Sequence, residues 1–125
     1  MTWTYVQSNG DMKQDGVVVF TGGYAGYGDE GKNKPHMQCV ANVGPLPQGK
    51  YTLERLILKD QHMGSYVIEL KPDPSNDMCG RSGFYIHGDS ISRPGLASTG
   101  CIILARAQRE EMWKSGDKDL EVIEK

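Results

Sequence analysis

Two residues are best suited to chemistry: a histidine at the end of one short apolar run and a cysteine at the start of the next. The run Phe84–His87 ends in His87, and Cys101 begins a run that continues to Leu104. The segment between them is rich in serine, glycine and proline, which is typical of a loop. One loop can bring the thiol and the imidazole together, as a cysteine nucleophile requires. We expect Cys101 to be the nucleophile and His87 its general base or its imidazolium partner.

Small and hydroxylated residues surround this pair. Gly88 and Gly100 allow the backbone to approach a substrate closely. The N–H groups of Gly100 and Cys101 are candidate donors to an oxyanion. Ser98 and Thr99 add hydroxyl groups beside them, which we expect to contact the substrate. A lone cysteine is usually an inert small apolar residue, so it is the combination that favours catalysis.

A metal site is an alternative use of three cysteines and three histidines. No two cysteines form a Cys-x-x-Cys pair, and the histidines lie far apart, at positions 36, 62 and 87. The ligand spacing typical of zinc is therefore absent, and we expect neither a metal nor a cofactor. An odd number of cysteines leaves one thiol free if the other two pair.

The elements that must position the pair are mostly strands. The chain of 125 residues is long enough for one core, so we expect a single domain over residues 1–125. It contains 16 glycines, which with the short apolar runs favours a β domain with tight turns. Apolar and β-branched patterns predict strands at residues 3–7, 17–20 (a central strand), 51–58, 65–70, 84–87, 102–104 and 120–123.

One helix and one long loop complete the predicted elements. Residues 106–115 form the expected helix, with Gly116 just after its end. Met112 lies on its apolar side, and Arg109 on its polar side. Residues 21–35 are rich in glycine and predict a loop without regular structure, in which Tyr24 contacts the substrate.

Charge and hydropathy exclude several classes of partner. The net charge is −2, so no basic field points to nucleic acid. No apolar run approaches the roughly 18 residues of a membrane span. Residues 1–13 are polar and lack the apolar segment of a Sec signal peptide, so we expect no such signal.

Several motifs resemble those of L,D-transpeptidase-like proteins, in which His-x-x-Gly precedes Ser/Thr-His-Gly-Cys. Here His87-Gly88-Asp89 precedes the segment Ser98–Ile102, with Thr99 in place of the second histidine. Ile103 and Leu104 replace an arginine often found after the cysteine. More closely, the chain resembles the type VI secretion L,D-transpeptidase effectors of the Tlde1 group. The other matching stretches are Trp3–Tyr5, Gly22–Gly26, Asn33, Gly44–Tyr51 and Gly80–Phe84.

The resemblance implies a fold and a reaction. The fold would be a single L,D-transpeptidase-like β domain with one short C-terminal helix. The reaction would be acyl transfer on the stem tetrapeptides of peptidoglycan, with water (L,D-carboxypeptidase), a D-amino acid (exchange) or another stem's amine as acceptor. The carbonyl of Gly88 would orient His87, which leaves Asp89 optional as a third member, and we expect Asp89 to contact the substrate. Arg81 could bind the carboxylates of the stem.

The resemblance also implies partners and a compartment. An antibacterial effector without a Sec signal would need a secretion-system delivery component and would act in the periplasm of a target bacterium. The producing cell would carry a cognate immunity protein. If the protein works in that oxidising compartment, Cys39 and Cys79 could pair and leave Cys101 free.

Two rival functions remain open at this stage. One is a non-catalytic cell-wall-binding β module in which Cys101 is structural and its sulfur unreactive. The other is a thiol peptidase or amidase that cuts another peptidoglycan bond. Thiol reactivity separates the first from the enzyme, and product masses separate the second.

Overall fold

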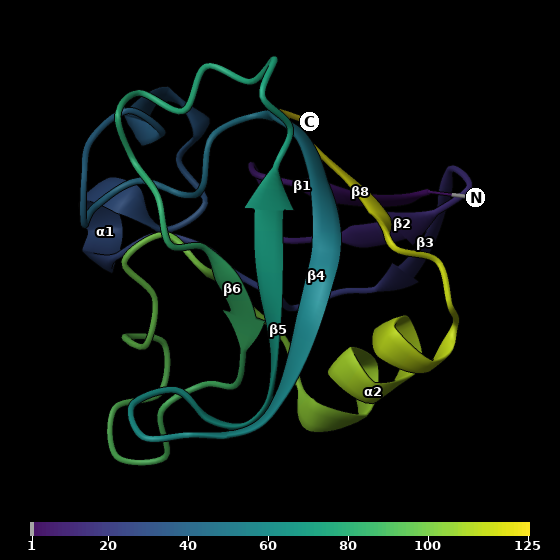
Figure 1. Ribbon diagram of the computed structural model, residues 1–125. Coiled ribbons are helices and arrows are strands. Elements are labelled where there is room, and N and C mark those ends of the chain that lie inside the picture. Colours follow the sequence, from purple (N-terminus) through teal and green to yellow (C-terminus); the bar gives the residue numbers. More distant parts are fainter. Residues whose placement is uncertain (1) are drawn as a thin grey trace.

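Eight strands form one sheet, and residues far apart in sequence meet within it (Figure 1). The computed structural model describes residues 2–125. In spatial order the strands are β3-β2-β1-β8-β4-β5-β6-β7, so the mostly β fold expected from the sequence is confirmed. The strands are β1 (Trp3–Val6), β2 (Met12–Gln14), β3 (Val17–Phe20), β4 (Gly49–Asp60), β5 (Gly64–Pro72), β6 (Tyr85–His87), β7 (Ile102–Ile103) and β8 (Asp119–Ile123).

The two longest strands, β4 and β5, form an antiparallel hairpin in the middle of the molecule (Figure 1). The carboxylate of Asp60 closes its turn, accepting the backbone N–H groups of His62 and Met63, both at 2.8 Å. The register shifts between Leu53 and Arg55, and such an irregularity bends a hairpin. Both strands exceed the predicted ranges because backbone pairing continues into their polar ends.

Strand β8 joins the first three strands to the rest of the sheet. It pairs in parallel with β1 and antiparallel with β4. Leu120 and Val122 of β8 are buried, as are Trp3 and Tyr5 of β1. The alternation of apolar residues in these segments therefore matches one buried face.

The outer end of the sheet differs from the prediction. Strand β3 is an edge strand rather than a central one, and Val17, Val18 and Val19 are exposed. Its inner neighbour β2 was not predicted, because Met12 is its single apolar residue. Met12 is fully buried, and β2 pairs with β1 and β3. Tertiary pairing, rather than local composition, makes this segment a strand.

The loop after β3 is more regular than its glycine content predicts. Helix α1 (Gly28–Gly31) and the 3₁₀ turn η1 (Pro35–Met37) interrupt it. The expectation of no regular structure over residues 21–35 was therefore wrong. Backbone bonds hold α1, including Gly31 N–H to Tyr27 O at 3.1 Å, and Tyr27 N–H reaches Val43 O at 2.8 Å.

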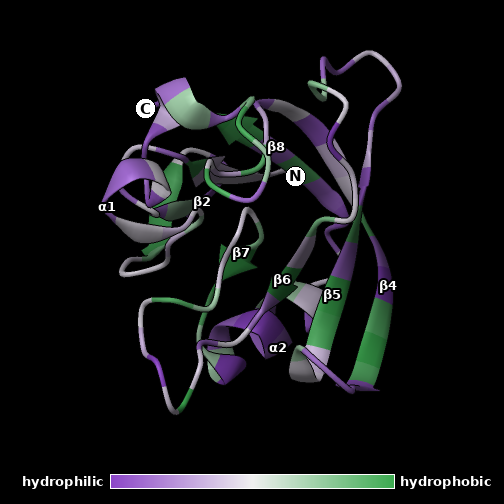
Figure 2. Ribbon diagram, turned by 90° about the vertical axis from the view of Figure 1, so that its left-hand side faces the viewer, coloured by the Kyte–Doolittle hydropathy of each residue, from purple (hydrophilic) through white to green (hydrophobic). Residues whose placement is uncertain are grey.

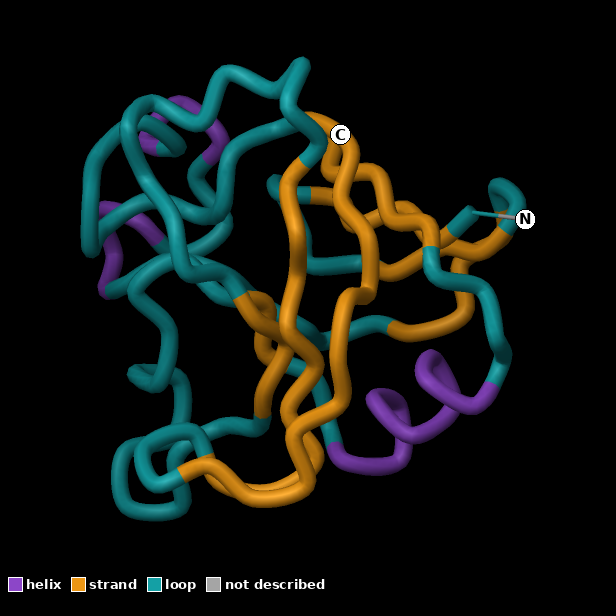
Figure 3. Tube along the Cα trace, viewed as in Figure 1, coloured by secondary structure: helices purple, strands orange, loops and turns teal. Residues whose placement is uncertain are grey.

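Helix α2 (Arg106–Lys114) confirms the predicted helix. The Gln108 side chain accepts the Ala105 N–H at 3.0 Å and so caps its first turn. Gly116, with φ at +79°, follows the helix as expected. The prediction for Arg109 was wrong, because this residue lies on the buried side with Met112. Figure 3 shows α2 as the main helix, packed beside the strands.

The core lies between the sheet and the segments that cover it. It gathers Trp3, Tyr5, Ile68, Ile86, Ile102 and Met112, among others. Strands β6 and β7 are neighbours in the sheet, and β7, which consists of two isoleucines, is coloured as hydrophobic in Figure 2. The buried strand expected at residues 102–104 is confirmed, as all three are buried. Among residues 2–125, no helix is long and apolar enough to cross a membrane.

Candidate active site

The sheet brings His87 and Cys101 onto neighbouring strands. Strands β6 and β7 are parallel, with Ile86 beside Ile102 and His87 beside Ile103. Cys101 comes directly before β7, so the same register places it level with Tyr85. Residues alternate between the faces of a strand, so His87 and Cys101 share the face opposite Ile86 and Ile102. The predicted pair is thus assembled by one parallel strand pairing.

The thiol of Cys101 is partly buried at this face. Its Sγ lies 3.9 Å from the carbonyl oxygen of Gly83, to which it donates. Burial raises the pKa of the thiol, while a backbone hydrogen bond from Tyr85 and the positive charge of Arg81 act in the opposite direction. Cys101 therefore rests as a protonated thiol at neutral pH.

The imidazole of His87 is buried and neutral. Burial lowers its pKa; the charge of Arg109 lowers it further, while the Gly88 hydrogen bond and the charges of Asp60 and Asp89 raise it. Nδ1 lies 2.9 Å from the Gly88 carbonyl oxygen. A carbonyl can only accept, so Nδ1 carries the proton and Nε2 has a free lone pair. The orientation expected from Gly88 is therefore observed.

The thiol and the imidazole are neighbours without a direct bond. Of the hydrogen bonds formed by residues 2–125, none joins His87 to Cys101; the sulfur donates to Gly83 instead. One torsion, χ1, places the Cys101 sulfur. Catalytic hydrogen bonds are often long before substrate binds, so a rotation of the thiol is the movement that would complete the pair.

Ser98 is buried and bonds to three backbone groups rather than to a substrate. Its Oγ donates to Cys101 O at 2.6 Å and accepts the N–H groups of Gly26 and Gly100, both at 3.0 Å. This corrects two predictions: Ser98 is fully buried, and the N–H of Gly100 is not free for an oxyanion. The N–H of Cys101 has no protein acceptor among the described residues, so it remains the candidate donor.

Arg81 is committed to the backbone and not free for a substrate carboxylate. The four N–H bonds of its terminal nitrogens all have carbonyl acceptors, which corrects the expected role as a carboxylate anchor. Thr99 is exposed, and its carbonyl oxygen is one of the four acceptors of Arg81. Nη1 donates to Gln38 O (2.5 Å) and Pro45 O (2.9 Å), and Nη2 to Gly44 O and Thr99 O (both 3.1 Å).

Tyr24 and Asp89 close the loop between the two strands. The Tyr24 hydroxyl donates to Asp89 Oδ1 at 2.6 Å and accepts the Ala97 N–H at 3.0 Å. Asp89 also accepts the N–H groups of Ser90 and Gly95. Both residues therefore hold the loop, contrary to their expected substrate contacts, and Asp89 is not a hydrogen-bond partner of His87.

A pocket of about 210 Å³ opens beside Cys101. One wall comes from residues 79–84 and another from Ala41 and Asn42, while residues 99–101 form its end. Cys39 and Cys79 are joined by a disulfide with 5.2 Å between their Cα atoms, as hypothesised from the sequence. Cys101 is the free thiol. The disulfide therefore joins two segments that bound the pocket beside the Cys101 sulfur.

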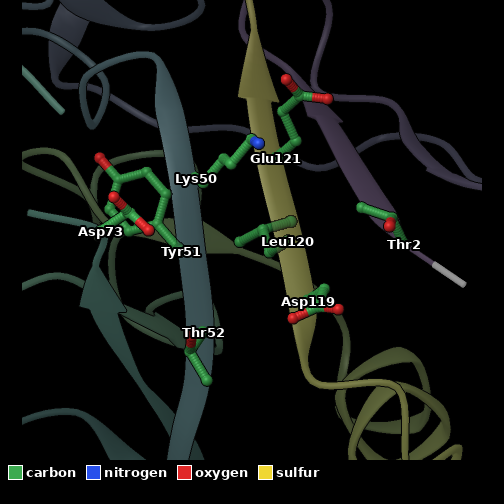
Figure 4. Close-up of a pocket in the computed structure, with 8 residues that line it drawn as sticks. All are labelled: Thr2, Lys50, Tyr51, Thr52, Asp73, Asp119, Leu120 and Glu121. Carbon is green, nitrogen blue, oxygen red and sulfur yellow. The ribbon is translucent and has the colours of Figure 1, made fainter. Parts of the chain in front are cut away.

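A larger hollow lies elsewhere, and no thiol or imidazole is among its lining residues. It has about 450 Å³ and lies over β4 and β8 (Figure 4). Lys50, Asp119 and Glu121 are among its lining residues. Strands β5 and β6 separate β4 from β7 in the sheet, so this hollow is remote from Cys101.

Arg109 is the site residue that sequence reasoning missed. It is 5% exposed, and its Nε and Nη1 have no hydrogen-bond partner. A methyl group at Gly88 would lie 3.0 Å from Nη1, so the guanidinium packs directly against the residue after His87. The available signal was spacing, because Arg109 precedes Met112 by three residues and so shares its helix face.

Comparison with known proteins agrees with this geometry. The model of the Tlde1 domain family matches residues 20–123. The fold is similar to L,D-transpeptidase 1 of Mycobacterium tuberculosis (14% identity, TM-score 0.51) and to the L,D-transpeptidase Yku of Stackebrandtia nassauensis (11%, 0.51). Each match covers 98% of this chain. This chain spans only 60% of the length of the first L,D-transpeptidase and 54% of the second. No curated protein matches the sequence.

Proposed function

The chain belongs to the Tlde1 domain family, and from this premise we propose that it is a cysteine-dependent acyl transferase acting on peptidoglycan stem tetrapeptides. The observation that carries the proposal is the free thiol of Cys101, which lines a pocket and directly precedes the strand that pairs with the strand of the buried, neutral His87. The L,D-transpeptidase-like fold supports the same reaction class.

In the first step the Cys101 sulfur attacks the carbonyl carbon of the diamino acid at position three of the stem. Nε2 of His87 takes the thiol proton, so the nucleophile is a thiolate only while it reacts. The carbonyl oxygen becomes an oxyanion, to which the Cys101 N–H can donate. When the tetrahedral intermediate collapses, the bond to the terminal D-alanine breaks and the imidazolium returns its proton to the leaving amine.

In the second step the thioester passes to an acceptor. Water gives a tripeptide, a D-amino acid gives an exchanged tetrapeptide, and the side-chain amine of another stem gives a cross-link. His87, neutral again, takes the proton of the acceptor while the sulfur leaves and is reprotonated. The same two side chains therefore serve both half-reactions.

Purified protein incubated with tetrapeptide muropeptides, with and without a D-amino acid, tests this proposal by mass spectrometry. We expect loss or exchange of the terminal alanine. Cys101→Ala should abolish the reaction and leave the thermal midpoint near that of wild type, because the side chain is small. Cleavage at another bond would favour a thiol peptidase or amidase. Unchanged muropeptides together with an unreactive sulfur would favour a cell-wall-binding module.

We further propose that the protein is a secreted antibacterial effector acting in the periplasm of a target bacterium. The Cys39–Cys79 disulfide supports an oxidising compartment. Family membership supports a delivery component and an immunity protein as partners.

A further inference from the structure

Arg81 makes an unusual set of bonds for an arginine beside a pocket. Three of its four acceptors belong to the segment of residues 38–45, and the fourth, Thr99 O, belongs to the segment that carries Cys101. The planar guanidinium fork reaches all four because its donors point in fixed directions. It thereby joins two segments more than fifty residues apart to the chain at residue 81.

The contact with the cysteine segment is close. A methyl group at Gly100 would lie 2.7 Å from Nη2 of Arg81 and 2.8 Å from the Phe84 ring. The guanidinium carbon lies 5.1 Å from the centre of that ring. Gly100 also has a φ of +152°, which side chains rarely adopt. Arg81 and Phe84 thus set how the backbone enters Cys101.

The charge of Arg81 has no carboxylate partner. The ion pairs found among residues 2–125 do not include it, and burial lowers its pKa. The four carbonyl dipoles stabilise this cation, but they leave its full positive charge without a negatively charged partner. In this site the negative charges are those of the reaction: the thiolate of Cys101 and the oxyanion that follows.

We propose that Arg81 is a positioning residue for acyl transfer, which holds the Thr99–Cys101 backbone through its fork and favours the reacting anion through its charge. This inference rests on the proposed function. It separates two contributions of one side chain: the fork places the Cys101 sulfur and N–H, and the charge favours the thiolate.

Two substitutions separate these contributions. Arg81→Lys keeps the charge but cannot reach four carbonyls, so kcat should fall about 100-fold with a much smaller change in KM. The pH midpoint of Cys101 alkylation by iodoacetamide should stay near that of wild type. Arg81→Gln also removes the charge, and this midpoint should move to higher pH. Arg55→Gln is the matched control, because Arg55 is exposed and pairs with Glu69 far along β4.

A second variant keeps the test decisive if the Arg81 variants fold poorly. Gly100→Ala leaves Arg81 in place but presses on Nη2 and Phe84, so it should lower kcat in the same way. The thermal midpoint of each variant is measured first, and kcat is then measured well below it, where the variant is folded. Wild-type kcat in folded Arg81→Lys and Gly100→Ala, or an unchanged alkylation midpoint in Arg81→Gln, would overturn the inference. If the wild type releases no alanine, the proposed function fails, while the alkylation midpoints still report on the charge of Arg81.

Discussion

At the scale of single residues, two side chains rest in uncharged forms. Burial lowers the pKa of His87 and raises that of Cys101. The proposed acyl transfer would therefore start from a thiol and an imidazole, and not from a stored thiolate–imidazolium pair. This favours general-base activation, one of the two mechanisms that the sequence left open.

The pH dependence of kcat/KM should reflect these forms. A His87 pKa below its ordinary value of 6.5 moves the acidic limb below pH 6.5. A Cys101 pKa above its ordinary 9.0 keeps thiolate from accumulating until more alkaline pH. We expect a plateau across neutral pH in the rate of alanine release. The free energy of unfolding should also fall on acidification. A lowered histidine pKa contributes stability that is fully present above about pH 6.5 and is lost as the pH falls below that value. A rate that falls between pH 8 and 7 would contradict a neutral base.

Replacing Arg109 should move the acidic limb in a known direction. Arg109 lowers the pKa of His87, while Asp60, Asp89 and the Gly88 carbonyl raise it. In Arg109→Met the acidic limb should therefore shift to higher pH. The thermal midpoint should not fall much, because an unpaired buried cation is replaced by an apolar side chain of similar length. Arg106→Met, on the same helix but exposed, is the control. An acidic limb that stays in place would show that Arg109 does not act on His87.

At the scale of elements, a loop held at both ends connects His87 to Cys101, the two proposed catalytic residues. The segment from Gly88 to Ala97 leaves β6 after His87 and returns to Ser98 before the cysteine. Burial would raise the pKa of Asp89, but hydrogen bonds from Tyr24, Gly95 and Ser90 outweigh this and hold it below its usual value. The loop is therefore closed by a carboxylate that stays ionised.

Removing one hydroxyl should loosen this loop. Tyr24→Phe deletes the bonds to Asp89 and Ala97, at a cost of about 1–3 kcal/mol in the free energy of unfolding. Amide hydrogen exchange at Gly95 and Ala97 should become faster, and alanine release slower. Tyr27→Phe, in the same glycine-rich segment but exposed, should change neither. Unchanged exchange in Tyr24→Phe would mean that the loop is held by other contacts.

Local sequence could predict the strands that are apolar and the pair that they carry. His87 and Cys101 follow from their residue types at strand ends. The roles of Arg81, Ser98 and Tyr24 could not be predicted, because their partners are backbone groups or side chains distant in sequence. Arg81 and its acceptor Gln38, for example, are 43 residues apart. Strand β2 could not be predicted for a similar reason, since its pairing partners rather than its composition make it a strand.

At the scale of the whole molecule, the compartment should decide whether the protein harms a cell. Produced in a Gram-negative cytoplasm, it should be tolerated, because peptidoglycan lies outside the inner membrane. Fused to a cleavable secretion signal, it should slow growth and distort cell shape as tetrapeptides are consumed. Growth curves and microscopy measure both effects. The same fusion with Cys101→Ala should be harmless at matched periplasmic levels; equal toxicity would favour a binding module.

The central position of β8 has a consequence for the order in which the molecule can be assembled. In the backbone pairing of the described sheet, β8 is the one strand that links β1–β3 to the β4–β7 half. During synthesis, the residues of β1–β3 and of β4–β7 therefore leave the ribosome before residues 119–123, which link them in the sheet. Pairing β1 with β8 closes a loop of more than a hundred residues, and such distant pairings form slowly. We therefore expect the two parts of the sheet to join late in folding, once β8 has been made.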